Sequence, residues 1–125
     1  KNSTGYEEVD CLNFVNWVKE NFNENDEIYC KMNIEGSEYE ILEKFLVEGI
    51  VGWFDLFWVD FHADKLTNLV PKAKEVCEHC GLTDWRQVNR NYENDLIKRL
   101  KNILGNKFMR QQEAEDRGIQ KYVRF

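Results

Sequence analysis

Residues 29–42, YCKMNIEGSEYEIL, decide the fold of this 125-residue chain, because they join a strand pattern to the start of a helix. Apolar and polar side chains alternate in the first part of the segment, which is the period of a β-strand, and we expect a strand over residues 28–35. One face of this strand carries Lys31, Asn33 and Glu35, although interior strands of parallel sheets are apolar on both faces. Polar groups at the carboxyl end of such a strand indicate a ligand site, because open α/β sheets bind ligands there.

A helix follows directly, and the sequence marks both of its ends. Ser37 and Glu40 have the spacing of a capping box, and apolar residues at helical spacing predict a helix over residues 37–48. Gly49 is well placed to end it. The next apolar run, FDLFWVDFH at residues 54–62, is short, aromatic and β-branched, so it predicts a second buried strand. Strand, helix and strand form a parallel crossover, and the predicted fold class is α/β.

The remaining segments add helices to what we expect to be a single domain over residues 1–125. Apolar residues at helical spacing predict helices over residues 9–22 and 67–80, and the same spacing recurs over residues 96–104. The segment KYVRF, residues 121–125, predicts a closing strand.

The central segment also carries a resemblance to a known family. KMNIEGSEYEILE, residues 31–43, resembles the K-I-D-x-E-G-x-E-x-x-x-L segment of the FkbM family of S-adenosylmethionine-dependent methyltransferases. Upstream, VDCLNFV at residues 9–15 resembles the family's T-L-D-x-F entry into a helix, and WVDFH at residues 58–62 resembles its V-E-x-H strand ending. The resemblance covers residues 7–65 in the family's order and spacing. The family's usual aspartate is Asn33 here, which keeps a hydrogen-bonding group but removes a charge.

This resemblance implies a partial doubly wound sheet with flanking helices, of the Rossmann-like class I methyltransferase type. It implies that the chain is the carboxyl-terminal half of such an enzyme, with S-adenosylmethionine as donor and a hydroxyl of a sugar or other small molecule as acceptor. Such folds hold the nucleoside of the donor with a Gly-rich turn, and the seven glycines of this chain form no G-x-G. We therefore expect that the chain does not bind S-adenosylmethionine tightly by itself, and we assign no residue to the donor.

The candidate catalytic edge follows from the two predicted strands. Parallel neighbours end at the same edge of a sheet, so Asn33 and Glu35 are expected close to Asp60 and His62. Methyl transfer to a hydroxyl requires alignment of the reactants and removal of a proton, and His62 or Glu35 is the candidate base. Asp60 and Asn33 would orient the base or the acceptor. Lys31 is a further candidate for substrate binding, but an ion pair with Glu35 on the same strand face is the favoured explanation for it.

These residues also have structural explanations. A histidine at a strand end is often a satisfied surface or capping residue, and Glu35 favours the positive end of the helix that follows it. Asn33 and the missing G-x-G are equally expected of a non-enzymatic α/β binding or assembly module that has lost the donor site. Both hypotheses stay open at this point, and a strand followed by G-x-G in an upstream coding region would favour the enzyme.

The charge distribution restricts the partners. A net charge of -6 argues against a general nucleic-acid binder, which needs clustered positive charge. Residues 1–84 have a balance of -11 and residues 85–125 a balance of +5. The simpler interpretation is a basic helical tail, residues 85–125, that packs on an acidic body, and the alternative is an anionic substrate or partner that meets this tail.

The four cysteines predict core thiols more than a metal site. Cys77, His79 and Cys80 lie in a lone C-x-x-C without the second pair of a structural zinc site, and both thiols fall on the apolar stripe of their predicted helix. We therefore expect no bound metal, and zinc is the third and weaker hypothesis. Free thiols suit a reducing cytoplasm, and neither a signal peptide nor an apolar run of roughly 20 residues is present to bring the chain to a membrane.

One physical consequence concerns the edge of the predicted sheet. The sequence predicts no earlier strand to pair with the strand over residues 28–35. One edge of this strand therefore exposes a row of backbone hydrogen-bonding groups. Because the chain starts at Lys1 rather than methionine, we expect it to be part of a longer product. The expectation is self-association, or pairing with the missing amino-terminal segment.

Overall fold

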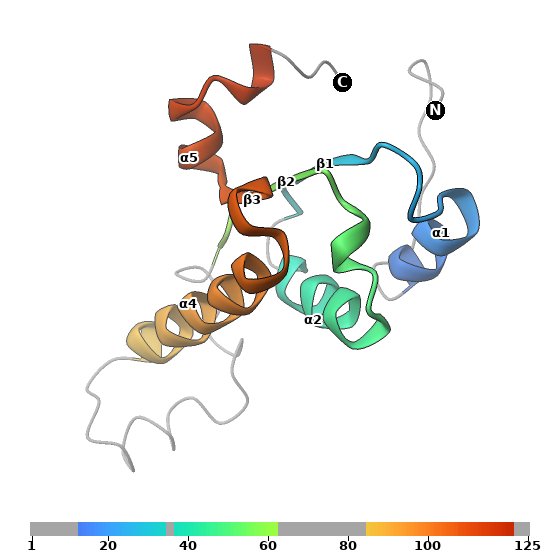
Figure 1. Ribbon diagram of the computed structural model, residues 1–125. Helices are drawn as coiled ribbons and strands as arrows, with labels where there is room; N and C mark the ends of the chain where they lie inside the picture. The colour runs from blue at the N-terminus through green and yellow to red at the C-terminus, as the bar shows by residue number, and fades with distance from the viewer. Residues whose placement is uncertain (1–12, 35–36, 63–84, 122–125) are drawn as a thin grey trace.

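The computed structural model describes residues 13–34, 37–62 and 85–121, which form a mixed α/β fold (Figure 1). In chain order, and with η for a 3-10 helix, the elements are α1 (Phe14–Asn21), β1 (Tyr29–Met32), α2 (Glu38–Glu48), η2 (Val51–Trp53), β2 (Leu56–Val59), α4 (Trp85–Leu104), η4 (Gly105–Lys107), β3 (Phe108–Arg110), α5 (Gln111–Asp116) and η5 (Ile119–Lys121). The predicted α/β class is confirmed. No helix in the described part of the chain is long and apolar enough to cross a membrane.

Three parallel strands form one sheet, in the order β1-β2-β3. Tyr29 is paired with Leu56 at the start of the β1–β2 ladder, and Met32 with Val59 at its end. The two predicted strands therefore exist and are parallel neighbours, although each is only four residues long. The third strand was not predicted, because its three residues are too few to show a period of two.

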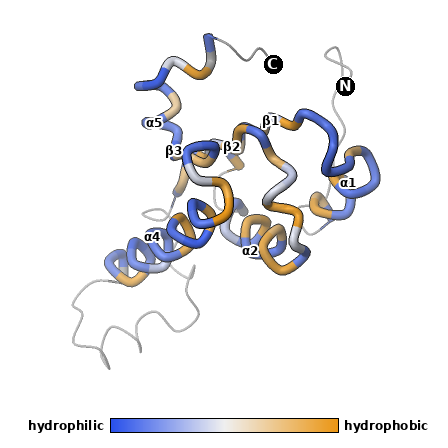
Figure 2. The backbone as a smooth tube through the Cα atoms, in the orientation of Figure 1, coloured by the Kyte–Doolittle hydropathy of each residue, from blue (hydrophilic) through white to orange (hydrophobic). Residues whose placement is uncertain are grey.

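The two faces of the sheet are covered by different helices, because side chains alternate along each strand. Phe57 and Val59 of β2 belong to a large core that they share with α1, α2 and α4. Trp58 and Met109 belong to a second, smaller core with Ala114 of α5 on the other face. In Figure 2, hydrophobic residues recur along α2 and at intervals along α4, as expected for helices with one buried side.

Aromatic rings fill the centre of the larger core. The ring centroid of Phe54 lies 4.6 Å from that of Phe57 and 5.2 Å from that of Phe45, and Phe57 contacts Phe108 at 5.7 Å. Tilted and edge-on pairs of this kind add about 0.5–1.5 kcal/mol each beyond the burial of their surface. This packing fixes α2 on β2 and β3, and so fixes the start of α2 beside the carboxyl ends of the strands.

The ends of α2 confirm one prediction and correct another. Gly49 adopts the left-handed conformation, with φ 73°, and its N–H donates to the carbonyl of Leu46, so the helix ends where predicted. The predicted capping box at Ser37 is wrong, because the Ser37 side chain makes no capping hydrogen bond. A capping residue normally has extended backbone angles, whereas Ser37 is already helical, with φ -85° and ψ -6°.

Helix α1 is confirmed over the part that the structure describes. It begins at Phe14, and Val15 and Val18 are buried against the larger core as the apolar spacing predicts. The first residues of the predicted helix, including Cys11, lie outside the described residues.

The basic segment after residue 85 contains the longest helix of the described chain. Leu96, Leu100 and Leu104 of α4 are buried, so the predicted helical spacing is confirmed there. Of the predicted closing strand, Lys121 lies in the 3-10 helix η5 instead, and the rest lies outside the described residues. The predicted helix over residues 67–80, with Cys77, His79 and Cys80, lies outside them as well.

Candidate functional site

The carboxyl ends of β1 and β2 meet at one edge of the sheet, as the sequence predicted. The backbone N–H of Asp60, just after β2, donates to the carbonyl of Met32 at the end of β1, with an N–O distance of 2.9 Å. Asn33 follows Met32 and is exposed, and His62 lies two residues beyond Asp60. Asn33, Asp60 and His62 are therefore at the same edge, whereas Glu35 lies outside the described residues.

The imidazole of His62 is held by a carboxylate that the sequence analysis did not select. Its Nδ1 lies 3.0 Å from Oε1 of Glu38, the first residue of α2. The Glu38 side chain is completely buried, and the His62 side chain is 9% exposed. A carboxylate can only accept a hydrogen bond, so with Glu38 ionised Nδ1 is the donor, and a neutral imidazole then keeps its lone pair on Nε2.

Asp60 lies near the other ring nitrogen of the same imidazole. Its Oδ2 is 3.9 Å from Nε2 of His62, which is within ion-pair range but too long for a hydrogen bond. The Asp60 side chain is 44% exposed. One ring nitrogen of His62 is thus bound to a buried carboxylate, and the other faces a half-exposed one.

A second polar contact fixes the backbone of His62. Its N–H donates to the hydroxyl of Tyr39, at 3.2 Å, and that hydroxyl donates to Oε1 of the buried Glu93 on α4, at 2.8 Å. Glu93 Oε2 in turn lies 3.0 Å from Nη1 of Arg110, the last residue of β3. Burial and the bond to Glu93 raise the pKa of Tyr39 far above its ordinary value, so it remains a hydroxyl that can donate.

These contacts define what we call the edge cluster: Glu38, Tyr39, Asp60, His62, Glu93 and Arg110. It draws residues from α2, β3, α4 and the segment after β2, so the whole fold determines its geometry. Glu38 and Tyr39 could have been selected from the sequence, because Glu38 is the second glutamate of the family segment and Tyr39 is its neighbour. For Glu93 and Arg110 the sequence offered no motif.

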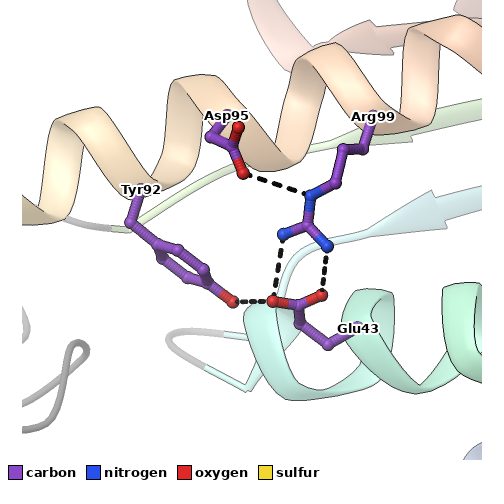
Figure 3. A network of polar contacts seen from close by, with 4 residues as sticks. All are labelled: Glu43, Tyr92, Asp95 and Arg99. Atoms are coloured by element: carbon purple, nitrogen blue, oxygen red, sulfur yellow. Dashed lines mark hydrogen bonds and ion pairs between the residues drawn. The ribbon is translucent and has the colours of Figure 1, made fainter.

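A second polar network joins α2 to α4 away from the strand ends (Figure 3). Arg99 reaches from α4 and binds both carboxylate oxygens of Glu43 on α2, at 2.8 and 3.1 Å, while Tyr92 donates to Glu43 at 2.7 Å. Asp95 is the fourth member, 3.2 Å from Nε of Arg99. The hydrogen bond from Arg99 holds the pKa of Glu43 below its ordinary range. We call this half-exposed set, Glu43, Tyr92, Asp95 and Arg99, the interhelix cluster.

The remaining predicted binding residue is on the surface. Lys31 is exposed and lies on β1, and the ion pair predicted between it and Glu35 involves a residue outside the described ones. Within residues 13–34, 37–62 and 85–121 there is no group of histidine, cysteine and acidic side chains that could hold a metal ion. Cys30, the cysteine on β1, is a half-buried free thiol, and burial raises its pKa to about 12.

No protein family, no curated protein and no solved structure matched this chain.

Proposed function

We propose that this chain supplies the acceptor-binding part of an S-adenosylmethionine-dependent methyltransferase of the FkbM type, built on a partial Rossmann-like sheet. The observation that supports the proposal most is the Glu38–His62 contact. It joins the two segments that carry the resemblance, since Glu38 lies in the K-I-D-x-E-G-x-E segment and His62 ends the V-E-x-H strand.

In this proposal His62 is the general base. S-adenosylmethionine would supply the methyl group and, through its positively charged sulfur, most of the driving force. Nε2 of His62 would accept the proton of the acceptor hydroxyl when the methyl group passes from the sulfur of the donor to that oxygen and the thioether leaves, and Glu38 on Nδ1 would stabilise the resulting imidazolium. Glu38 acts through His62 and is therefore a positioning residue.

The other predicted residues keep secondary roles in the proposal. Asp60 is half-exposed and faces Nε2, so it is placed to orient the acceptor hydroxyl or to favour a cationic donor. Asn33, exposed at the end of β1, is a further contact for the acceptor, and Lys31 and Glu35 are retained as candidates on sequence grounds. No residue is assigned to the nucleoside of the donor, because the chain has no G-x-G.

A non-enzymatic binding or assembly module is the second candidate function. The specific observation in its favour is Asn33, an amide at the position where the family has an aspartate. The edge cluster would then act only to hold α2 and α4 on the sheet.

Titration calorimetry with S-adenosylmethionine separates these functions without knowledge of the acceptor. It should be carried out on this chain and on the longest natural product that contains it. Saturable binding by the longer product, with weak binding by this chain, is the expected result. If neither binds the donor, the methyltransferase proposal fails and the module is favoured. Tight binding by this chain alone would contradict the assignment of its residues to the acceptor side.

A further inference from the structure

One edge of β1 has no neighbouring strand among the described residues, because β1 is the terminal strand of the sheet (Figure 1). The carbonyl groups of Ile28 and Met32 accept hydrogen bonds, at 2.8 and 2.9 Å, from backbone N–H groups at the two ends of β2. Backbone groups of successive strand residues point to opposite sides, so the N–H and C=O groups of Tyr29 and Lys31 point away from β2. This outer edge is able to pair with another strand.

The side chains along this edge are unusually exposed for their type. Tyr29 is 39% and Ile34 38% exposed, and these are two of the four large hydrophobic side chains that are exposed in the described part of the chain. An edge strand with exposed apolar side chains promotes pairing with other chains unless something covers it.

The charges on β1 and just before it are self-complementary. Glu27, Tyr29 and Lys31 alternate along one face, so an acidic, an aromatic and a basic side chain follow one another. The hydroxyl of Tyr29 donates to the carboxylate of Glu27, which places negative charge beside the aromatic ring. A second copy of this strand that runs in the opposite direction presents its lysine to this pair.

We propose that two copies of the chain pair through β1, antiparallel and about a two-fold axis centred on Cys30, to form one continuous sheet with three strands from each copy. In this register Lys31 lies opposite Tyr29 of the second copy, next to its Glu27, and Ile28 lies opposite Met32. The outward backbone groups of Tyr29 and Lys31 then bond to each other across the axis. The inference concerns the chain as it stands and does not rest on the proposed function; in a longer product, an amino-terminal strand would compete for the same edge.

Two neighbouring registers also pair outward backbone groups. A pairing centred on Tyr29 places Lys31 opposite Glu27, which lies outside β1, so it joins fewer strand residues. A pairing centred on Lys31 is disfavoured by charge, because it places the two lysines directly opposite each other, and like charges in that position destabilise a strand pair. In the pairing centred on Cys30, Lys31 of each copy contacts Tyr29 of the other, so this contact forms twice. The interaction between a cation and an aromatic ring is attractive.

Sedimentation velocity over a range of protein concentrations tests the proposal. The expected species has twice the 15.0 kDa mass of the chain. Lys31→Pro removes an outward N–H without removing a β1–β2 bond, which is the position where an edge strand accepts proline, so it should give a folded monomer. Circular dichroism and a cooperative thermal transition verify that this variant is folded. A chain that remains monomeric at every concentration overturns the proposal.

Charge reversal tests pairing through β1 and does not depend on the proline variant. Lys31→Glu and Glu27→Lys should each weaken the dimer roughly tenfold, because two unfavourable contacts arise per dimer, and the double variant should restore it. Lys98→Glu is the matched control, since Lys98 is an exposed lysine on α4. A dimer that Lys31→Glu leaves unchanged uses another surface, and the proposal is then wrong. Calorimetry with S-adenosylmethionine reports separately on the proposed function.

Discussion

The edge cluster and the interhelix cluster both start on α2 and both reach α4, yet they differ in burial and in charge balance. In the interhelix cluster, Arg99 and Glu43 are 40% and 35% exposed and neutralise each other through two parallel hydrogen bonds. In the edge cluster, the carboxylates of Glu38 and Glu93 are almost completely buried, with His62 and a tyrosine hydroxyl among their partners.

Under the proposed function, the edge cluster is the one adapted for chemistry. Burying a carboxylate is costly, and apolar side chains of similar volume often stabilise a fold better. The larger apolar core already holds α2 and α4 on the sheet, so stability alone does not require the buried carboxylates at the strand ends. Their position beside His62 is explained if the imidazole must be held in one orientation with Nε2 available.

The largest expected effect is on methyl transfer. His62→Asn removes the base but keeps a polar side chain, so the turnover number of the longest natural product should fall about 10²–10⁴-fold, the usual contribution of a positioned base. The affinity for S-adenosylmethionine should stay unchanged. Transfer of labelled methyl groups to a panel of hydroxyl compounds measures the turnover number, and titration calorimetry measures the affinity for S-adenosylmethionine. Equal turnover in the variant would remove His62 from the mechanism.

Glu38→Gln should have a smaller effect of the same kind. The glutamine fills the same volume but can present an N–H to Nδ1, which favours the wrong tautomer of His62, so turnover should fall roughly a hundredfold, as for a misplaced catalytic group. The pH dependence of turnover should also change in the Glu38→Gln variant. A variant with lower stability but an unaltered turnover number and pH profile would make Glu38 purely structural.

Two tyrosines allow a matched test of stability. Tyr39→Phe deprives the His62 N–H of its acceptor and the buried Glu93 of a donor, and we expect it to lower the free energy of unfolding by about 1–3 kcal/mol. Tyr92→Phe leaves Glu43 with its bonds to Arg99, so its cost should be below about 1 kcal/mol. Urea unfolding measures both, and equal losses would mean that the two clusters do not differ as described.

The interhelix cluster should give the smallest effects. Arg99→Met should lower the free energy of unfolding by at most about 1 kcal/mol, the usual range for exposed ion pairs, and should leave turnover unchanged. The pKa of Glu43 is lower in the folded chain than in the unfolded one, mainly because of Arg99. Its contribution is therefore present above the unfolded pKa, about 4.3, and is lost as the pH falls through the folded pKa.

The difference in stability between the parent chain and Arg99→Met should accordingly shrink in acid. Urea unfolding at a series of pH values measures this difference, and a constant difference down to the lowest pH would contradict the assigned role of Glu43.

The central strand-helix-strand unit could be predicted from the sequence because its signals are local. Alternation marks β1, helical spacing marks α2, and Gly49 needs only its own conformation to end the helix. The predicted capping box was wrong because Ser37 already has helical backbone angles, which the spacing of Ser37 and Glu40 does not report. Strand β3 was not predicted because three residues show no period.

The candidate site was predictable only in part, for a related reason. Asn33, Asp60 and His62 follow from the rule that parallel strands end at one edge. Glu38 is three residues beyond the end of the predicted strand, but its contact with His62 arises from the packing of α2 on the sheet. Glu93 and Arg110 reach the site from α4 and β3, and no spacing in the chain reports such long-range contacts.

Determining the tautomer of His62 tests most directly whether this residue can act as the base. Nitrogen-15 NMR of the imidazole, recorded in its neutral form on the chain as it stands, distinguishes Nδ1–H from Nε2–H, and a His79→Gln variant assigns the signals of the only two histidines. The predicted result is a neutral ring protonated on Nδ1 in the parent chain, and a change of this tautomer in Glu38→Gln. A ring protonated on Nε2 would leave no lone pair toward the acceptor and would contradict the role of His62 as the base.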